Sequence, residues 1–482
     1  MMTSHLNKKK TEEILKKLAL PNKAFSARYP GEPSERQPIH SVYGGAHLFQ
    51  FDTPKKLGDV ALRTMEEYAV DFGVFARALG LRGSEKLPLA SEAIVQLRET
   101  ITKDLEKSKT ERPESWLALM VYDRVIAKLK REPVEDFRID FEDGFGNRSE
   151  EEEDEAAEKT AKEVAKGMKE GTLSPFIGIR VKTFTNELAP RSIRTADIFV
   201  STLLSATKGK LPEHFVITLP KVTIPEQVEG FIQILEMLEE ENDLKKGSLK
   251  MEVMIETTQS VIDHEGKCVI PSLIQASQGR CIGAHLGVYD YTASCNIIAA
   301  HQGMDHPSCD FVRQMMKNSL AGTGIFLSDG ATNIMPVPVH PPKGKLHTKQ
   351  IQENFRAVHY AWKLAYQQTR NSLKNAIYQG WDLHPAQLPI RYAACYSFFL
   401  EVLLASTERL KNFVDQAAKA TLAGNVFDDA ATAQGLLNYF LQGMKCGAIT
   451  EEEMLATGLT LKEIEYRSFA KIIEKRLKKK EK

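Results

Sequence analysis

The sequence predicts an α/β protein whose main domain is a closed (β/α)8 TIM barrel, with an N-terminal arm and a C-terminal all-helical cap. Short apolar segments rich in β-branched residues alternate with longer charged helical segments from about residue 42 to residue 390. Eight such short segments can be counted, and eight βα repeats are the number that closes this barrel. An open, doubly wound sheet is the alternative, but the glycine-rich first turn typical of that fold is missing.

The expected strands follow one another in order along the chain, and helical stretches such as 226–243 fall between most of them. The eight expected strands are 41–51, 137–143, 175–181, 214–221, 249–257, 281–290, 324–330 and 376–385.

The two ends of the chain have a different character from the barrel. Residues 1–40 contain one short amphipathic helix, from about Thr11 to Leu20, followed by a stretch rich in Pro, Gly and Arg that suits an extended arm. Residues 391–482 show only helical patterns, including a helix expected over 461–477. The expected domains are therefore the arm (1–40), the barrel (41–390) and the helical cap (391–482).

Composition excludes several classes of protein. The 482 residues include 64 Lys and Arg against 64 Asp and Glu, a balance that rules out a polycationic nucleic-acid binder. There is no uninterrupted run of about 18 apolar residues, so no membrane span is expected. The lysine-rich start lacks the pattern of a secretory signal, and the six cysteines are widely spaced. We therefore expect a cytoplasmic protein with reduced thiols and no nucleic-acid or membrane partner.

Ionisable residues stand at the ends of five of the expected strands. In a (β/α)8 barrel the C-terminal ends of the strands converge on the active-site face, so these side chains are expected to meet in one pocket. They are Asp140, Glu142 and Asp143 at the end of the second expected strand, Arg180, Lys221, Glu256 and Asp290.

Several carboxylates at close quarters raise one another's pKa unless a cation neutralises them. Without a Cys/His cluster nearby, a hard ion that prefers oxygen ligands is favoured, namely Mg²⁺, or Mn²⁺ with similar ligand preferences. Glu256 and Asp290 are the candidate metal ligands, and Asp143 or Glu142 is a candidate to hold a metal-bound water. The alternative is that the acids form salt bridges with Arg180 and Lys221 and leave the site without metal.

Six motifs carry a resemblance to a known group of enzymes. IDFEDG (139–144), IRVK (179–182), LPKV (219–222), MIETT (254–258), LGVYDYTAS (286–294) and WDLHPAQLPI (381–390) stand in the order seen in the citrate lyase β-subunit and malate synthase superfamily. The resemblance covers roughly residues 40–440. It implies a (β/α)8 barrel that makes or breaks carbon–carbon bonds beside a carbonyl group.

A seventh segment resembles malate synthases in particular. FDDAATAQGLLNYF (427–440) is similar to their MEDAATAE segment, and this resemblance implies that Asp429 is the catalytic base. From composition alone, the acidic pair 428–429 would be an ordinary helix N-terminus. Because Gln434 and the run after Arg180 differ from malate synthases, glyoxylate and acetyl-CoA stay open as substrates.

The resulting hypothesis is an Mg²⁺-dependent carbon–carbon lyase or synthase that acts through a metal-stabilised enolate of a small 2-oxo acid or acyl-CoA. Arg180 is expected to face the oxyanion or carboxylate, and Asp429 to move the proton beside the carbonyl. Lys221 is a supporting charge. Asp140 and His384 are also expected to support the site, and a structural role is preferred for His384. The sequence leaves open whether a CoA thioester is a substrate and whether the protein forms a homo-oligomer.

Two alternatives remain for the function. The first is phosphotransfer with phosphoenolpyruvate on the same barrel, for which Lys221 and the pair Arg191 and Arg194 could supply cationic groups. The second is a non-catalytic barrel that serves as a binding module. A ligand-free collection of charges at one face costs stability, which counts against the second alternative.

Overall fold

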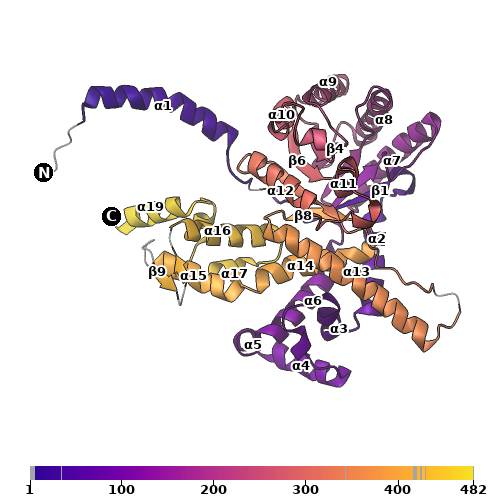
Figure 1. The fold of residues 1–482 in the computed structure, drawn as a ribbon, viewed down its shortest axis with the longest axis vertical. Coiled ribbons are helices and arrows are strands. Elements are labelled where there is room, and N and C mark those ends of the chain that lie inside the picture. Colours follow the sequence, from indigo (N-terminus) through magenta and orange to yellow (C-terminus); the bar gives the residue numbers. More distant parts are fainter. Residues whose placement is uncertain are drawn as a thin grey trace.

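The fold of the chain is a closed barrel of eight parallel strands, as the sequence predicts. The computed structural model describes residues 6–33, 35–341, 344–415, 421–423, 426–428 and 430–480 (Figure 1). Each strand pairs with its neighbours in sequence, and β8 pairs with β1 to close the barrel. The strands are β1 (Ser41–Gly45), β2 (Asp136–Asp140), β3 (Phe176–Arg180), β4 (His214–Leu219), β5 (Lys250–Ile255), β6 (Cys281–Leu286), β7 (Phe326–Ala331) and β8 (Gln379–Asp382).

Several strands end earlier than the sequence predicts. The sixth strand was expected to run to Asp290, but β6 ends at Leu286, and Asp290 lies in the first turn of the short helix α11 (Val288–Ser294). Glu142 and Glu256 likewise follow their strands instead of lying in them. The ionisable residues therefore stand on the loops above the strands, which is where barrel enzymes place their reactive groups.

Helices cover the outside of the barrel, and aromatic side chains pack them against it. Phe199 of α8, for example, stacks on Phe215 of β4 with ring centroids 5.9 Å apart. The first turn of α7 holds the acidic run that begins at Glu150, where Ser149 and Glu152 form a capping box. The helices of this layer are α6 (Pro113–Arg131), α7 (Glu150–Glu170), α8 (Ala189–Thr207), α9 (Pro225–Glu241), α10 (Ile270–Ala276), α12 (Pro307–Leu320), α13 (Thr348–Lys374) and α14 (Leu388–Leu400).

The connection between β1 and β2 is much longer than the single helix that usually joins two strands of such a barrel. It forms a group of helices that packs beside α13 and α14 (Figure 1), with Phe72 and Phe75 fully buried in it. The sequence reading did not separate this group from the barrel. Its members before α6 are α2 (Thr53–Tyr68), α3 (Phe72–Leu79), α4 (Ser91–Lys103) and α5 (Leu105–Glu111). Single 3₁₀ turns complete the connections: η1 (Ala46–Leu48), η2 (Ser84–Lys86), η3 (Thr258–Ser260), η4 (Ala299–His301) and η5 (Pro385–Gln387).

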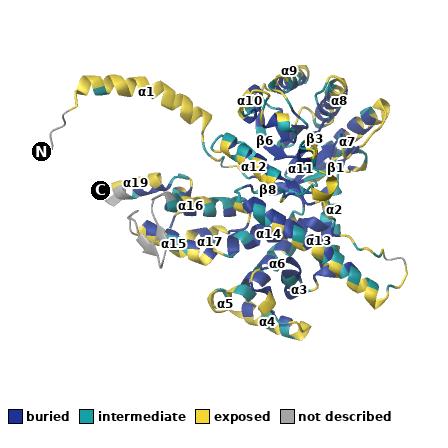
Figure 2. Ribbon diagram, viewed as in Figure 1, coloured by how far each residue is buried: buried dark blue, intermediate teal, exposed yellow. Residues whose placement is uncertain are grey.

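The N-terminal helix is longer than predicted. Helix α1 (Lys8–Arg28) begins at Asn7, whose Oδ1 accepts a hydrogen bond from the Lys10 amide at 3.1 Å. It continues through Pro21, where the prediction ended it. None of its residues is buried, and it extends away from the barrel (Figure 2). The chain after it returns to the barrel, where the Gly31 amide donates to the Gly322 carbonyl at 2.9 Å.

Within the described ranges, the C-terminal part consists of helices and one short antiparallel pair of strands, β9 (Thr421–Ala423) and β10 (Val426–Asp428). The boundary expected after residue 390 falls inside α14. The single helix expected over 461–477 is instead broken into two, because Arg467 adopts a left-handed φ of 51° between them. The helices are α15 (Leu403–Asp415), α16 (Ala430–Lys445), α17 (Glu451–Leu455), α18 (Leu461–Ile464) and α19 (Phe469–Lys480).

Among the described residues, no single helix is both long and apolar enough to cross a membrane. Two consecutive helical segments, Pro385–Leu400 and Leu403–Asp415, are long and apolar enough when they are taken together, but the chain bends between them.

The interior of the barrel holds a buried network of charges. Arg138 of β2 donates three hydrogen bonds to Glu252 of β5, at 2.9 Å (Nη2 to Oε1), 3.0 Å (Nη2 to Oε2) and 3.2 Å (Nε to Oε2), and also pairs with Asp136. His285 of β6 lies 3.1 Å from Glu252 through its Nε2, and the Trp381 indole donates to His285 Nδ1 at 3.0 Å. Arg138, Asp136, Glu252 and His285 are all buried, so the charged groups of the network lie away from water.

Replacing Arg138 with methionine should destabilise the protein strongly. The change leaves two buried carboxylates without their cation, and breaking a buried ion pair in this way costs about 3–5 kcal/mol. Arg194→Met is the matched control, because the Arg194 side chain is 59% exposed beside Asp154 and a surface pair of this kind is worth about 1 kcal/mol or less. Urea unfolding followed by circular dichroism measures both. Equal losses for the two variants would contradict the role given to Arg138.

Candidate functional site

The loops after β2, β4, β5 and β6 bring the predicted residues to one rim of the barrel, which we call the C-terminal mouth. Arg180 is the last residue of β3 and stands in register with Asp140, the last residue of β2. Five acidic residues gather there, and we call them the carboxylate cluster: Asp140, Glu142, Asp143, Glu256 and Asp290.

Arg180 is held rigidly by Asp140. Its Nε and Nη2 donate to the two Asp140 oxygens at 2.7 and 2.6 Å, a bidentate arrangement that fixes the plane of the guanidinium. Burial acts to raise the pKa of Asp140, but Arg180 and the backbone amides of Glu142 and Gly144 outweigh it and lower that pKa. Asp140 is therefore a charged support for Arg180. Nη1 of the same guanidinium is 2.9 Å from Glu142.

Lys221 lies at the centre of the cluster. Its ammonium group pairs with Glu142 and lies 3.2 Å from Asp143 and 3.6 Å from Asp290. The backbone has a left-handed φ of 50°, and its amide donates to Glu256 Oε1 at 2.7 Å. Burial acts to lower the pKa of Lys221, but the surrounding carboxylates outweigh it and raise the pKa. Lys221 thus connects four of the five acids.

Glu256 is the most unusual group in the mouth. It is 1% exposed, and its Oε2 has no hydrogen-bond partner among the described residues. Burial, together with the neighbouring Asp290 and Glu142, raises its pKa to about 8 even though Lys221 opposes the shift. A buried carboxylate oxygen without a partner indicates a position that a ligand or a cation can fill.

Sequence reasoning did not single out Gly287, which makes room for Glu256. A Cβ on Gly287 would lie 2.2 Å from Glu256 Oε2, far inside van der Waals contact. The signal in the sequence was the glycine in LGVYD directly after an apolar strand, but only the fold shows which side chain it faces.

Two aromatic residues of the mouth were also missed. Tyr43 of β1 and Trp381 of β8 pack together with ring centroids 4.5 Å apart. The Arg180 guanidinium lies 4.8 Å from the centre of the Tyr43 ring, a cation–π contact. The Trp381 ring centre lies 5.9 Å from the same guanidinium, so both rings contact Arg180.

The residues present fit a divalent cation that prefers oxygen ligands. Among the described residues of the mouth, five acidic side chains face two cations, Arg180 and Lys221, so ionisation of all five leaves negative charge that salt bridges do not compensate. The metal-free alternative accounts for Asp140 and Glu142 but not for Glu256 Oε2. No group of three or more potential ligand side chains is found within the described ranges, but Mg²⁺ normally takes only one or two carboxylates and keeps several waters. Glu256 and Asp290 are the pair that would hold it.

Two further predicted residues are His384 and Asp429. His384 caps η5, where its Nδ1 accepts a hydrogen bond from the Ala386 amide at 3.1 Å, and burial lowers its pKa. This geometry agrees with the structural role preferred for it. Asp429 lies outside the described residues, between β10 and α16, so its role as a base stays a prediction.

The arginines that could have served a phosphate group are occupied elsewhere. Arg191 lies 3.2 Å from Glu153, and Arg194 lies 2.6 Å from Asp154, so both hold α8 against α7. The phosphotransfer alternative therefore loses two of its three proposed cations.

Comparison with known proteins gives one family and several similar folds. The sequence model of a family described as a domain of unknown function, DUF6986, matches residues 18–472. No curated protein matches the sequence.

Solved structures with a similar fold are citrate lyase-like and malate synthase-like barrels. A citrate lyase from Burkholderia xenovorans is 15% identical, with 71% of this chain and 93% of that chain covered and a TM-score of 0.48. A malate synthase from Haloferax volcanii is 13% identical, with 92% and 98% covered and a TM-score of 0.43. Protein CitE from Mycobacterium tuberculosis, solved with magnesium and acetate, is 14% identical, with 57% and 86% covered and a TM-score of 0.33.

A methyl group at position 287 should displace Glu256 without unfolding the protein. In Gly287→Ala the new Cβ meets Glu256 Oε2 at 2.2 Å and Glu256 Cβ at 2.5 Å, so the side chain and its backbone must shift together. We expect loss of divalent-metal binding while the overall circular dichroism spectrum is retained. Gly230→Ala is the matched control, since a Cβ there meets only Phe184 at an ordinary 3.8 Å. Isothermal titration with Mg²⁺ measures the effect. Unchanged binding in the first variant would show that Glu256 is not needed where we place it.

Stability should depend on pH through Glu256. Folding raises the pKa of the Glu256 carboxyl from 4.5 to about 8. The stabilising contribution of this group to the free energy of unfolding is therefore fully present below about pH 4.5 and is lost as the pH rises to about 8. Glu256→Gln imitates the protonated form at every pH. In EDTA, the variant should match the wild type at pH 5 and be the more stable protein at pH 9. Stability curves that run parallel across this range would contradict the raised pKa.

Proposed function

We propose that this chain, which belongs to the DUF6986 family, is an Mg²⁺-dependent carbon–carbon lyase or synthase. Its substrate would be a small 2-oxo acid or an acyl-CoA that passes through an enolate. One observation carries the proposal, namely the buried Glu256 carboxylate with an unpaired oxygen, next to Asp290, in the mouth where Arg180 is fixed.

Arg180 would bind the negatively charged part of the substrate. Asp140 fixes Nε and Nη2, so the guanidinium cannot rotate, and its Nη1 edge is directed toward Glu142. A preorganised donor of this kind needs no reorganisation when charge develops, and one such donor contributes about 3–4 kcal/mol to lowering a barrier. When bound, Mg²⁺ would supply Lewis-acid polarisation of the carbonyl oxygen.

Lys221 would hold the acids together and position Glu256. Its ammonium group partly neutralises Glu142, Asp143 and Asp290, and its backbone amide fixes Glu256 Oε1, while Oε2 is left without a hydrogen-bond partner among the described residues. Proton transfer at the carbon beside the carbonyl is assigned to Asp429 on the resemblance to malate synthases alone. Such general base catalysis typically contributes about 10²–10⁴ in rate.

Metal dependence tests the proposal directly. At pH 8, Mg²⁺ should raise the melting temperature of the wild type in proportion to the logarithm of its concentration, because it binds only the folded state. Glu256→Gln and Asp290→Asn should lose this rise, whereas Asp154→Asn, which changes an acid on α7 outside the mouth, should keep it.

Activity assays then separate the possible reactions. Pyruvate, oxaloacetate, glyoxylate, acetyl-CoA and phosphoenolpyruvate are supplied in turn, with and without EDTA. Turnover of a 2-oxo acid or CoA ester that EDTA abolishes supports the proposal. Turnover that persists in EDTA, or that occurs only with phosphoenolpyruvate, would overturn it.

A further inference from the structure

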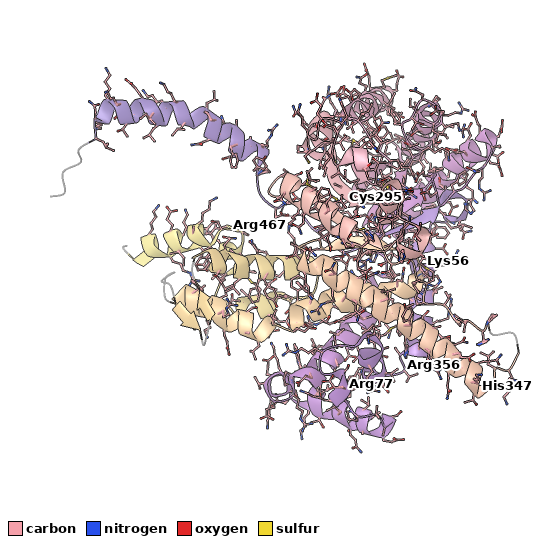
Figure 3. All side chains as sticks on the ribbon, viewed as in Figure 1. Lys56, Arg77, Cys295, His347, Arg356 and Arg467 are labelled. Atoms are coloured by element: carbon pink, nitrogen blue, oxygen red, sulfur yellow. The ribbon has the colours of Figure 1, made fainter. Side chains whose placement is uncertain are left out.

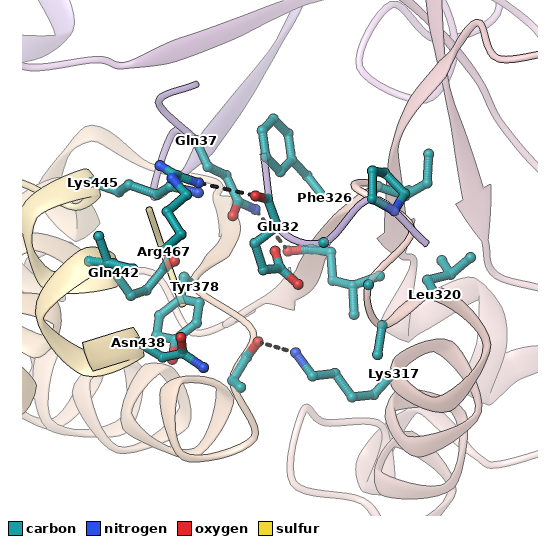
Figure 4. A pocket seen from close by; sticks show the side chains of 18 of the residues that line it. Glu32, Gln37, Lys317, Leu320, Phe326, Tyr378, Asn438, Gln442, Lys445 and Arg467 are labelled. Atoms are coloured by element: carbon teal, nitrogen blue, oxygen red, sulfur yellow. Dashed lines mark hydrogen bonds between the residues drawn. The ribbon is translucent and has the colours of Figure 1, made fainter. Parts of the chain in front are cut away.

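A cavity lies at the end of the barrel opposite the mouth. It has a volume of about 510 Å³ and is enclosed by the arm at residues 30–32, the start of β7 at Phe326, Tyr378 just before β8, and the C-terminal helices (Figure 4). Since Phe326 begins its strand, the cavity is at the N-terminal rim. Three parts of the chain that are far apart in sequence meet here.

Among the charged side chains that line it, basic groups outnumber acidic ones. Lys317 of α12, Lys445 of α16, Arg467 and Lys471 of α19 all line it, whereas Glu32 is the one carboxylate among the described lining residues. Arg467 lies where the C-terminal helices approach the barrel (Figure 3). We call this space the basic cavity. None of its four cations forms an ion pair with a carboxylate in the described part of the chain.

The hydrogen bonds of these cations go to neutral carbonyl groups. Lys317 Nζ donates to the Ala376 carbonyl at 3.0 Å, and Lys445 Nζ donates to the Pro33 carbonyl. Arg467 Nη1 donates to the carbonyls of Glu32 and Pro33 at 3.0 and 2.7 Å. Carbonyl oxygens orient the three side chains but do not cancel their charge.

The positive charges of Lys317 and Lys445 are destabilised by their surroundings in the cavity. Burial lowers the pKa of Lys317 and of Lys445, and for Lys445 the nearby Arg467 lowers it further, while Glu32 opposes both shifts. Lowered pKa values mean that the charged forms of these lysines are destabilised by their surroundings. An anion in the cavity would relieve this cost.

The other lining groups can recognise a polar ligand. Asn438 and Gln442 extend from α16, and Ser468 follows Arg467. The Asn438 carbonyl oxygen accepts from Gln434 at 2.8 Å, which leaves its amide NH2 as the end available for a ligand. The volume lies within the range of about 300–1,000 Å³ that is usual for small-molecule sites.

We propose that the basic cavity binds a small organic polyanion, a molecule with a phosphate group or with several carboxylates. Lys317, Lys445 and Arg467 would neutralise it from the barrel and from the C-terminal helices, and Lys471 would stand at the rim. Arginine matches both phosphate and carboxylate through its planar fork. Because the ligand would touch the arm, the barrel and the C-terminal helices together, its binding would join these three parts.

The test uses the full chain in EDTA, so that no metal takes part at the mouth. Pyrophosphate and citrate are the two probes, and NaCl at equal ionic strength is the control for screening. We expect at least one probe to raise the melting temperature in a saturable way. A rise with pyrophosphate alone assigns the site to phosphate, and a rise with citrate alone assigns it to carboxylates. No rise beyond that in NaCl would overturn the proposal.

Variants locate the binding. Lys317→Met and Arg467→Gln should each weaken the effective probe about ten-fold or more, as expected for the loss of a hydrogen bond to a charged group. Lys471 is exposed at the rim of the cavity, so Lys471→Met should not affect folding. This variant should weaken binding of the probe by a smaller factor. Arg194→Gln, a surface arginine on α8, should leave it unchanged. Equal affinity in the cavity variants and in Arg194→Gln would overturn the assignment.

Discussion

The buried guanidinium of Arg138 organises the interior of the barrel. A charge inside a protein is tolerated only when it is paired and hydrogen-bonded, so the strands around Arg138 must present matching groups at its height. Arg138 forms ion pairs with Glu252 of β5 and with Asp136 of its own strand, and His285 of β6 contacts Glu252. Because a shift of β5 against β2 would separate Arg138 from Glu252, this pairing constrains the registers on which the mouth depends.

The mouth rests on that interior. Tyr43 is near both arginines, because the charges of Arg138 and Arg180 both act on its hydroxyl, and its ring lies against the Arg180 guanidinium. Arg180 is then tied to Asp140. The site therefore holds two kinds of acidic side chain. Asp140 is paired with Arg180 and supports that residue, whereas Glu256 is buried and its Oε2 has no hydrogen-bond partner among the described residues. This difference separates the scaffold of the mouth from the part that can bind.

The zero net charge of the chain conceals two poles. The mouth collects five carboxylates against two cations, and the basic cavity at the opposite rim collects four cations against one carboxylate. Balanced composition excludes a polycationic chain, but it does not describe how charge is distributed over the fold. Each pole has an excess that a ligand of opposite charge would neutralise.

The sequence by itself determined the barrel, because strand and helix periodicity are local properties and eight repeats close the sheet. It also placed Arg180, Lys221 and Glu256 at one rim, since all parallel strands end there. It did not reveal the full length of α1, the break at Arg467 or the clearance that Gly287 leaves. Only the tertiary structure decided which acid is paired and which has a free oxygen. Electrostatic pairing depends on distances between residues far apart in the chain, and no local pattern records those distances.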